Sequence, residues 1–122
     1  MESETLKTTD EYSAARATHP RVSLADMETK IIRQFYLNGG DAALVFDQHT
    51  ARNGPLDDEI KSLEALTICI LVMKNGFTVI GKSAPASPEN FDREKGERFA
   101  YEDAIKQLWP LEGYALRDKL SA

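Results

Sequence analysis

Few side chains in this 122-residue chain have the type and spacing that catalysis requires. Two carboxylate pairs, Glu89 with Asp92 and Glu102 with Asp103, could act as acid and base if a pocket raised the pKa of one member. Neighbouring acids on a helix otherwise face water. His49 is a further candidate for proton transfer, but it has no second histidine or cysteine at metal-ligand spacing. We therefore assign no catalytic residue and no metal site.

Sequence motifs for catalysis or cofactor binding are equally few. We predict no phosphate-binding loop, no zinc motif and no nucleophile elbow. The single cysteine, Cys69, lies in an apolar run, where a free thiol is usually buried. No cofactor is predicted.

The composition is typical of a single globular domain. Apolar residues make up 42% and charged residues 29% of the chain, and no apolar run approaches the length of a membrane span. The first residues lack the basic and apolar regions of a signal peptide. With 20 acidic against 15 basic residues, the net charge is −5, and no basic patch suits nucleic acid. We expect a cytoplasmic protein without membrane or nucleic-acid partners.

The strongest structural signal is a β-hairpin over about residues 67–83. Two β-branched apolar runs flank Asn75-Gly76, a dipeptide that favours a type I′ turn. With this dipeptide as the loop, the register places Val72 opposite Val79. Both faces of the hairpin are then apolar, so we expect a helix of the chain on one face and a second layer on the other.

Three to five helices are predicted around the hairpin, in one α+β domain over residues 20–122 that follows a flexible N-terminal arm, residues 1–19. The first begins at the N-cap Ser23 and ends before Asn38-Gly39-Gly40. Residues 42–48 fit a short helix or a strand, and we favour the helix. Pro110 is expected to end the long helix. The predicted helical segments are 23–37, 42–48, 55–65, 88–109 and 111–120.

Several stretches of the chain resemble a family of small tailed-phage proteins, typified by phage N-four gene forty-nine and phage Sf-six gene sixty-six. The stretches are LTICILVMKNGFTVIGKSA (66–84), ASPENFD (86–92), WPLEGY (109–114), and HPRV (19–22) with the first helix. The resemblance covers about the last four-fifths of the chain. It implies a phage or prophage origin and a location in the host cytoplasm. It implies no activity, because the family is uncharacterised.

The resemblance directs attention to the loop between the hairpin and the long helix. Its polar side chains would form a rigid rim beside the first amides of that helix, where anionic groups bind. Helix capping and chain reversal are the alternative role of this loop, and Glu89 opposes an anion. Trp109 is either a core residue or a stacking platform. The predicted ligand-binding residues are Lys82, Ser83, Ser87, Glu89, Asn90 and Trp109.

Together these features predict a non-enzymatic phage accessory protein that sequesters or blocks a host component. The target is a host protein or a small anionic molecule, such as a nucleotide that serves as an immune signal. The alternatives are a small nucleotide-acting enzyme, with Glu89, Asn90 or His49 as its chemistry, and a structural or assembly protein. We also expect a homodimer, in which a second chain covers the spare face of the hairpin or extends the sheet through an edge.

Overall fold

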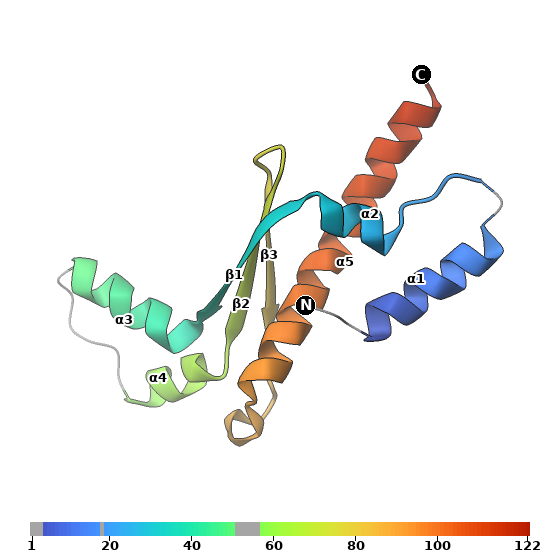
Figure 1. Ribbon diagram of the computed structural model, residues 1–122. Helices are drawn as coiled ribbons and strands as arrows, with labels where there is room; N and C mark the ends of the chain where they lie inside the picture. The colour runs from blue at the N-terminus through green and yellow to red at the C-terminus, as the bar shows by residue number, and fades with distance from the viewer. Residues whose placement is uncertain (1–3, 18, 51–56) are drawn as a thin grey trace.

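The computed structural model describes residues 4–17, 19–50 and 57–122, without the side chains of residues 48–50 and 57. Within that part, a three-stranded antiparallel sheet of order β1-β2-β3 packs with five helices, which confirms the predicted α+β class (Figure 1). In chain order the elements are α1 (Glu4–Arg16), α2 (Leu24–Thr29), β1 (Ile31–Asn38), α3 (Gly39–Thr50), α4 (Asp57–Glu64), β2 (Thr67–Met73), β3 (Thr78–Ser83), a 3₁₀ turn (Pro88–Asn90) and α5 (Arg93–Leu120).

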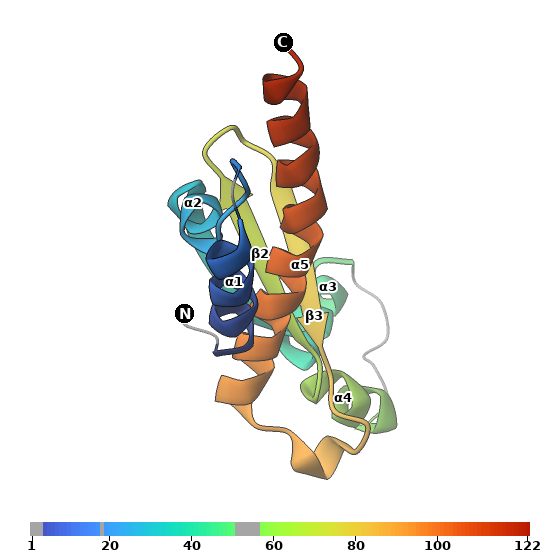
Figure 2. The same ribbon diagram turned by 90° about the vertical axis from the view of Figure 1, so that its right-hand side faces the viewer.

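The core lies between one face of the sheet and α5, which runs along that face (Figure 2). Cys69 and Leu71 of β2 are fully buried there against Tyr101 and Ile105 of α5. Gly81 of β3 lets the helix come close, because a Cβ at this position would stand 2.0 Å from the carbonyl oxygen of Ala100. The absence of a Cβ at Gly81 thus allows the short distance between the helix and the sheet.

The predicted hairpin is present, but its predicted register is wrong by one residue. The amide of Gly76, at φ +88°, donates to the carbonyl of Met73, and the Met73 amide donates to Phe77. Three residues therefore form the loop instead of two, as in a type I turn followed by a left-handed glycine. Leu71, not Val72, stands opposite Val79.

This one-residue difference moves every side chain of β3 to the opposite face. Val79, 5% exposed, enters the core beside Leu71, whereas Ile80 is 57% exposed on the other face. The sheet face away from α5 is consequently apolar and exposed.

The predicted first helix, residues 23–37, is wrong beyond Thr29. Ser23 caps α2 as expected, since its hydroxyl accepts from the Asp26 amide at 3.0 Å. From Ile31 onward the chain is instead strand β1, antiparallel to β2. The β-branched and aromatic residues here favour a strand, and β1 supplies the third strand that an isolated hairpin lacks.

The Asn38-Gly39-Gly40 sequence starts a helix and does not end one. The Asn38 side chain accepts from the Gly40 amide at 2.9 Å, at the first turn of α3. The favoured helix at 42–48 is thereby confirmed. The helix predicted at 55–65 is present as α4, although residues 51–56 lie outside the described part.

The long helix differs from its prediction at both ends. Ser87 makes no side-chain cap; the cap of α5 is Asp92, which accepts from the Lys95 amide at 3.2 Å. Pro110 lies inside α5, which continues for 28 residues in all. A proline inside a helix removes one backbone donor and crowds the preceding turn, and an ion pair of Glu112 with Lys30, at the C-cap of α2, anchors the turn that follows.

The segment predicted as a flexible arm contains helix α1. The 13-residue α1 buries Leu6 in the core, and Asp10 on α1 forms an ion pair with Arg21 at 2.8 Å. In the described part of the chain, none of the helices has the length and apolar character needed to cross a membrane.

Candidate functional site

The predicted ligand-binding residues do not meet in one place. Lys82 is exposed on β3, and Glu89 and Asn90 are exposed on the 3₁₀ turn. Trp109 lies sixteen residues along α5 from Arg93, which places it about 24 Å from the start of that helix. It packs half-buried against the core, so the core alternative describes it.

The polar side chains of the turn bond to one another. The Ser87 hydroxyl donates to a Glu89 oxygen at 2.7 Å, and this bond lowers the pKa of the Glu89 carboxyl. A general base working near neutral pH needs a raised carboxyl pKa. The geometry therefore does not equip Glu89 for that role.

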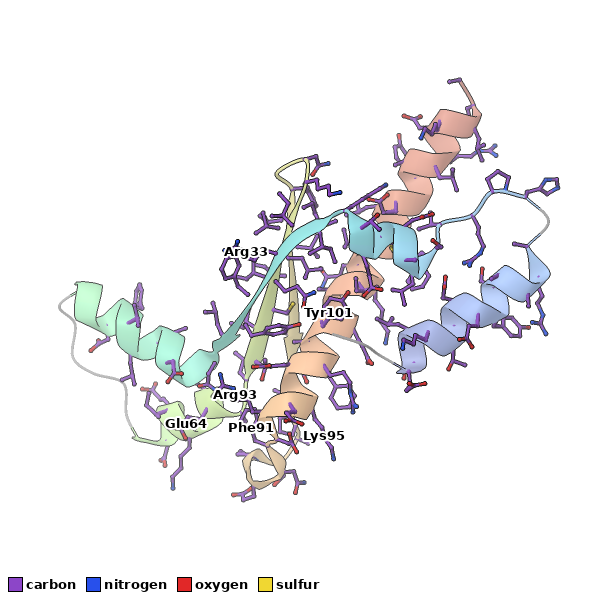
Figure 3. All side chains as sticks on the ribbon, in the orientation of Figure 1. Arg33, Glu64, Phe91, Arg93, Lys95 and Tyr101 are labelled. Atoms are coloured by element: carbon purple, nitrogen blue, oxygen red, sulfur yellow. The ribbon has the colours of Figure 1, made fainter. Side chains whose placement is uncertain are left out.

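Close to this turn, a hollow of about 500 Å³ opens at the end of the sheet where α3, α4 and the first turns of α5 meet. We call it the polar hollow. Glu64, Phe91 and Arg93 are labelled together at this end of the molecule in Figure 3. Its lining consists of Tyr36, Leu37, Asn38, Asp41, Glu64, Thr67, Phe91, Arg93 and Glu97.

Two close contacts build the walls of the polar hollow. The Asn38 amide donates to the carbonyl of Glu64 at 2.7 Å, which ties the end of β1 to α4. Gly96 brings the first turn of α5 against β2, because a Cβ there would lie 2.5 Å from the Thr67 hydroxyl. The hollow is thus assembled from segments that are far apart in sequence.

The charges of the hollow are unequal. Three carboxylates, those of Asp41, Glu64 and Glu97, face a single guanidinium, that of Arg93. The Arg93 side chain is bonded to Glu97 at 3.3 Å and remains largely exposed. The hollow therefore suits a ligand with a cationic or hydrogen-bond-donating group, while an anionic group fits only beside Arg93. No cluster in the described residues has metal-binding geometry.

Tyr36, which lines the hollow, and its cross-strand neighbour Cys69 are ionisable groups that are both held neutral. The Tyr36 hydroxyl donates to Gln34 at 2.9 Å, and burial raises the pKa of this phenol. Burial also raises the pKa of the Cys69 thiol to about 11. Because the thiolate is the reactive form, Cys69 is inert at neutral pH. Neither group is poised for acid–base or nucleophilic chemistry.

The other candidates for catalysis separate in the structure. Glu102 is buried in α5, whereas Asp103 accepts from the Lys82 amide at 3.0 Å, so this pair shares no site. Asp92 caps α5. The side chain of His49 lies outside the described part.

Residues 76–83 match the spacing of a phosphate-binding loop, Gly-x-x-x-x-Gly-Lys-Ser, so the expectation that the sequence lacks this motif was wrong. The structure nevertheless excludes that role. Such a loop joins a strand to a helix and wraps a phosphate with its amides, whereas here residues 78–83 are the hydrogen-bonded strand β3. The Lys82 amide bonds to Asp103 and faces no phosphate site.

Sequence reasoning missed the residues that do converge. Asn38 was assigned to a helix end, and Glu64 had no distinguishing neighbour. Phe91 and Arg93 border the predicted loop, which is the one signal that pointed to this end of the molecule.

Comparison with known proteins identifies a family. The model of the family described as "Phage protein (N4 Gp49/phage Sf6 gene 66) family" matches residues 22–120. This span contains every residue of the polar hollow and begins after α1. No curated protein and no solved structure gives a significant match.

Proposed function

The chain belongs to the phage protein (N4 Gp49/phage Sf6 gene 66) family, and on that premise we propose that it is a non-enzymatic phage accessory protein. It acts in the host cytoplasm by sequestering or blocking a host component, which it holds in the polar hollow. Such a protein acts stoichiometrically and needs no catalytic group.

The observation that supports binding is the combination of groups at the hollow. An aromatic ring, a guanidinium and carboxylates converge on a concave surface of ligand size. Tyr36 in the lining and Cys69 beside it have raised pKa values, because burial favours their neutral forms. This arrangement provides recognition without a nucleophile or a proton-transfer group.

The charge of the hollow favours a host protein as the target. Asp41 and Glu64 would accept hydrogen bonds from a lysine or arginine of the target, and such charge-assisted bonds are the stronger kind. A nucleotide used in host defence is the second candidate. It is supported by Phe91, which could stack on a base, and by Arg93 beside it, which could pair with a phosphate.

The two targets are separated by matched variants in one experiment. The tagged protein is recovered from infected host lysate, and the material that it carries is identified by mass spectrometry before and after heating. A bound nucleotide should be lost from Arg93→Ala and kept by Arg117→Ala, an exposed arginine near the other end of α5. A stoichiometric host protein should be lost from Glu64→Gln and kept by Glu94→Gln.

Turnover of a nucleotide that is abolished by Glu89→Gln would overturn the proposal in favour of a small enzyme. Recovery of the same ligand by the wild type and by both hollow variants would show that the hollow is not the binding site.

A further inference from the structure

The sheet face away from α5, which we call the open face, is apolar at most of its positions. Phe35, Leu37 and Ile80 lie on it and are exposed. Its positions on the three strands are Arg33, Phe35, Leu37, Ile68, Ile70, Val72, Thr78, Ile80 and Lys82. A contiguous apolar surface of this kind marks an interaction site.

Extension of the sheet through the β3 edge is blocked by α5. The Gln107 side chain donates to the outward carbonyl of Ile80 at 2.8 Å, and Asp103 accepts from the outward amide of Lys82 at 3.0 Å. Such side-chain contacts protect an edge from pairing with another strand. The opposite edge, β1, is irregular between Ile31 and Arg33. Pairing is therefore blocked at the β3 edge and disturbed at one end of the β1 edge, and the open face is the broad surface left for a partner.

Helix α3 matches the open face in apolar character and is opposite to it in charge. It projects on the side of the sheet away from α5 (Figures 1 and 2), and its Leu44, Val45 and Phe46 are exposed. Its sequence contains two aspartates and no lysine or arginine. The open-face positions of the fully described strands include two bases, Arg33 and Lys82, and no acid. The two surfaces are complementary in charge and alike in apolar character.

The open face alone is too small for a stable interface, so the contact must also include α3. From about 3.3 Å per residue and about 4.8 Å between strands, the face measures roughly 20 by 14 Å. That projected area, roughly 300 Å², is well below the ~800 Å² per partner of a stable interface. The twelve residues of α3 add a helix about 18 Å long.

We propose that a second copy of this chain covers the open face, with α3 of each copy lying on the open face of the other. In a two-fold dimer the same contact then occurs twice, because each copy gives a helix and receives one. Leu37 and Asp41 also line the polar hollow, so the hollow borders this contact, but the proposal requires no ligand there.

Complementary variants test the arrangement. By sedimentation at micromolar concentration, the wild type should have twice the 13.6 kDa mass of one chain. Ile80→Lys on the open face and Leu44→Lys on α3 should each be monomeric. The control is Tyr114→Lys, at a 75% exposed position near the far end of α5, which should remain a dimer. Far-ultraviolet circular dichroism verifies that each variant is folded.

The decisive step is to mix the two monomeric variants. A mixed dimer places both lysines in one helix-to-sheet contact and leaves the other contact intact, so dimers should reappear. Dimers that do not return would overturn the arrangement in favour of sheet-on-sheet or helix-on-helix packing. A monomeric wild type would overturn the proposal, as would a folded Ile80→Lys variant that still dimerises. A one-to-one complex with a host protein that only Ile80→Lys abolishes would assign the open face to that protein.

Discussion

Replacing Gly81 with alanine should separate α5 from the sheet. The new Cβ would lie 2.0 Å from the carbonyl oxygen and 2.5 Å from the amide nitrogen of Ala100 and Ala104, respectively. Both are backbone atoms of a helix, so no side-chain rotation relieves the clash. Ordinary contact begins near 3.4 Å, and the helix must therefore move by more than an ångström. Overpacking of a core typically costs about 1–3 kcal/mol, and this clash belongs at the upper end of that range or above it.

The assay is thermal unfolding, with a second glycine as the matched control. A loss of about 3 kcal/mol should lower the Tm by roughly 10 °C in a domain of this size. Gly113→Ala is the same chemical change inside α5, where an added Cβ meets nothing within 4 Å. It should stabilise the protein by about 0.5–1 kcal/mol. A Gly81→Ala variant as stable as the wild type would refute the reasoning. Rescue by Ala104→Gly would do so too, since removing that methyl leaves the backbone clashes in place.

Three further predictions concern the core. Tyr101→Phe should lower the free energy of unfolding in urea by about 1–2 kcal/mol, because Glu28 loses the hydroxyl that donates to it; an unchanged midpoint would contradict this. The pKa of Cys69 is raised from 9.0 to about 11, so the folded state retains this proton more tightly than the unfolded state does. The stability that this proton contributes is complete below pH 9 and is lost as the pH rises toward 11. Cys69→Ala should therefore show a smaller loss of unfolding free energy over this range. Parallel pH profiles of the wild type and the variant would exclude Cys69 as the cause. Leu71→Lys should prevent folding by burying an unpaired charge, whereas Ile80→Lys should fold; the reverse result in circular dichroism would show that the β-strand faces are wrongly assigned.

The hairpin was predictable because its signal is local. Asn75-Gly76 specifies a reversal within a few residues, and the flanking β-branched runs have no other regular structure to adopt. The register was not predictable, because a two-residue loop and a three-residue loop ending in glycine use the same dipeptide. The packing of Gly81 against Ala100 selects between them, and that contact joins parts of the chain that are about twenty residues apart.

Residues 31–38 illustrate a second limit of sequence reasoning. Ile31, Ile32, Phe35 and Tyr36 satisfy the spacing of an apolar helix face, which is why a helix was predicted there. In the structure, the segment pairs with β2 at every position except Ile32. A short apolar run does not distinguish these outcomes by its period, and the tertiary contact decides.

The same strand explains why the polar hollow was not predicted, and why the open face extends beyond the hairpin whose spare face was expected to be covered. Successive side chains of a strand point to opposite faces. Tyr36 and Asn38 therefore stand on the α5 side and line the hollow, while Phe35 stands on the open face. A helix at 23–37 would have placed Phe35 and Tyr36 on one stripe, and it would have formed neither the hollow nor the β1 part of the open face. Leu37 borders both surfaces, but Asn38 lines only the hollow and Phe35 lies only on the open face, so a change at each of these two positions acts on one surface. Ligand binding and self-association can thus be altered at positions only three residues apart.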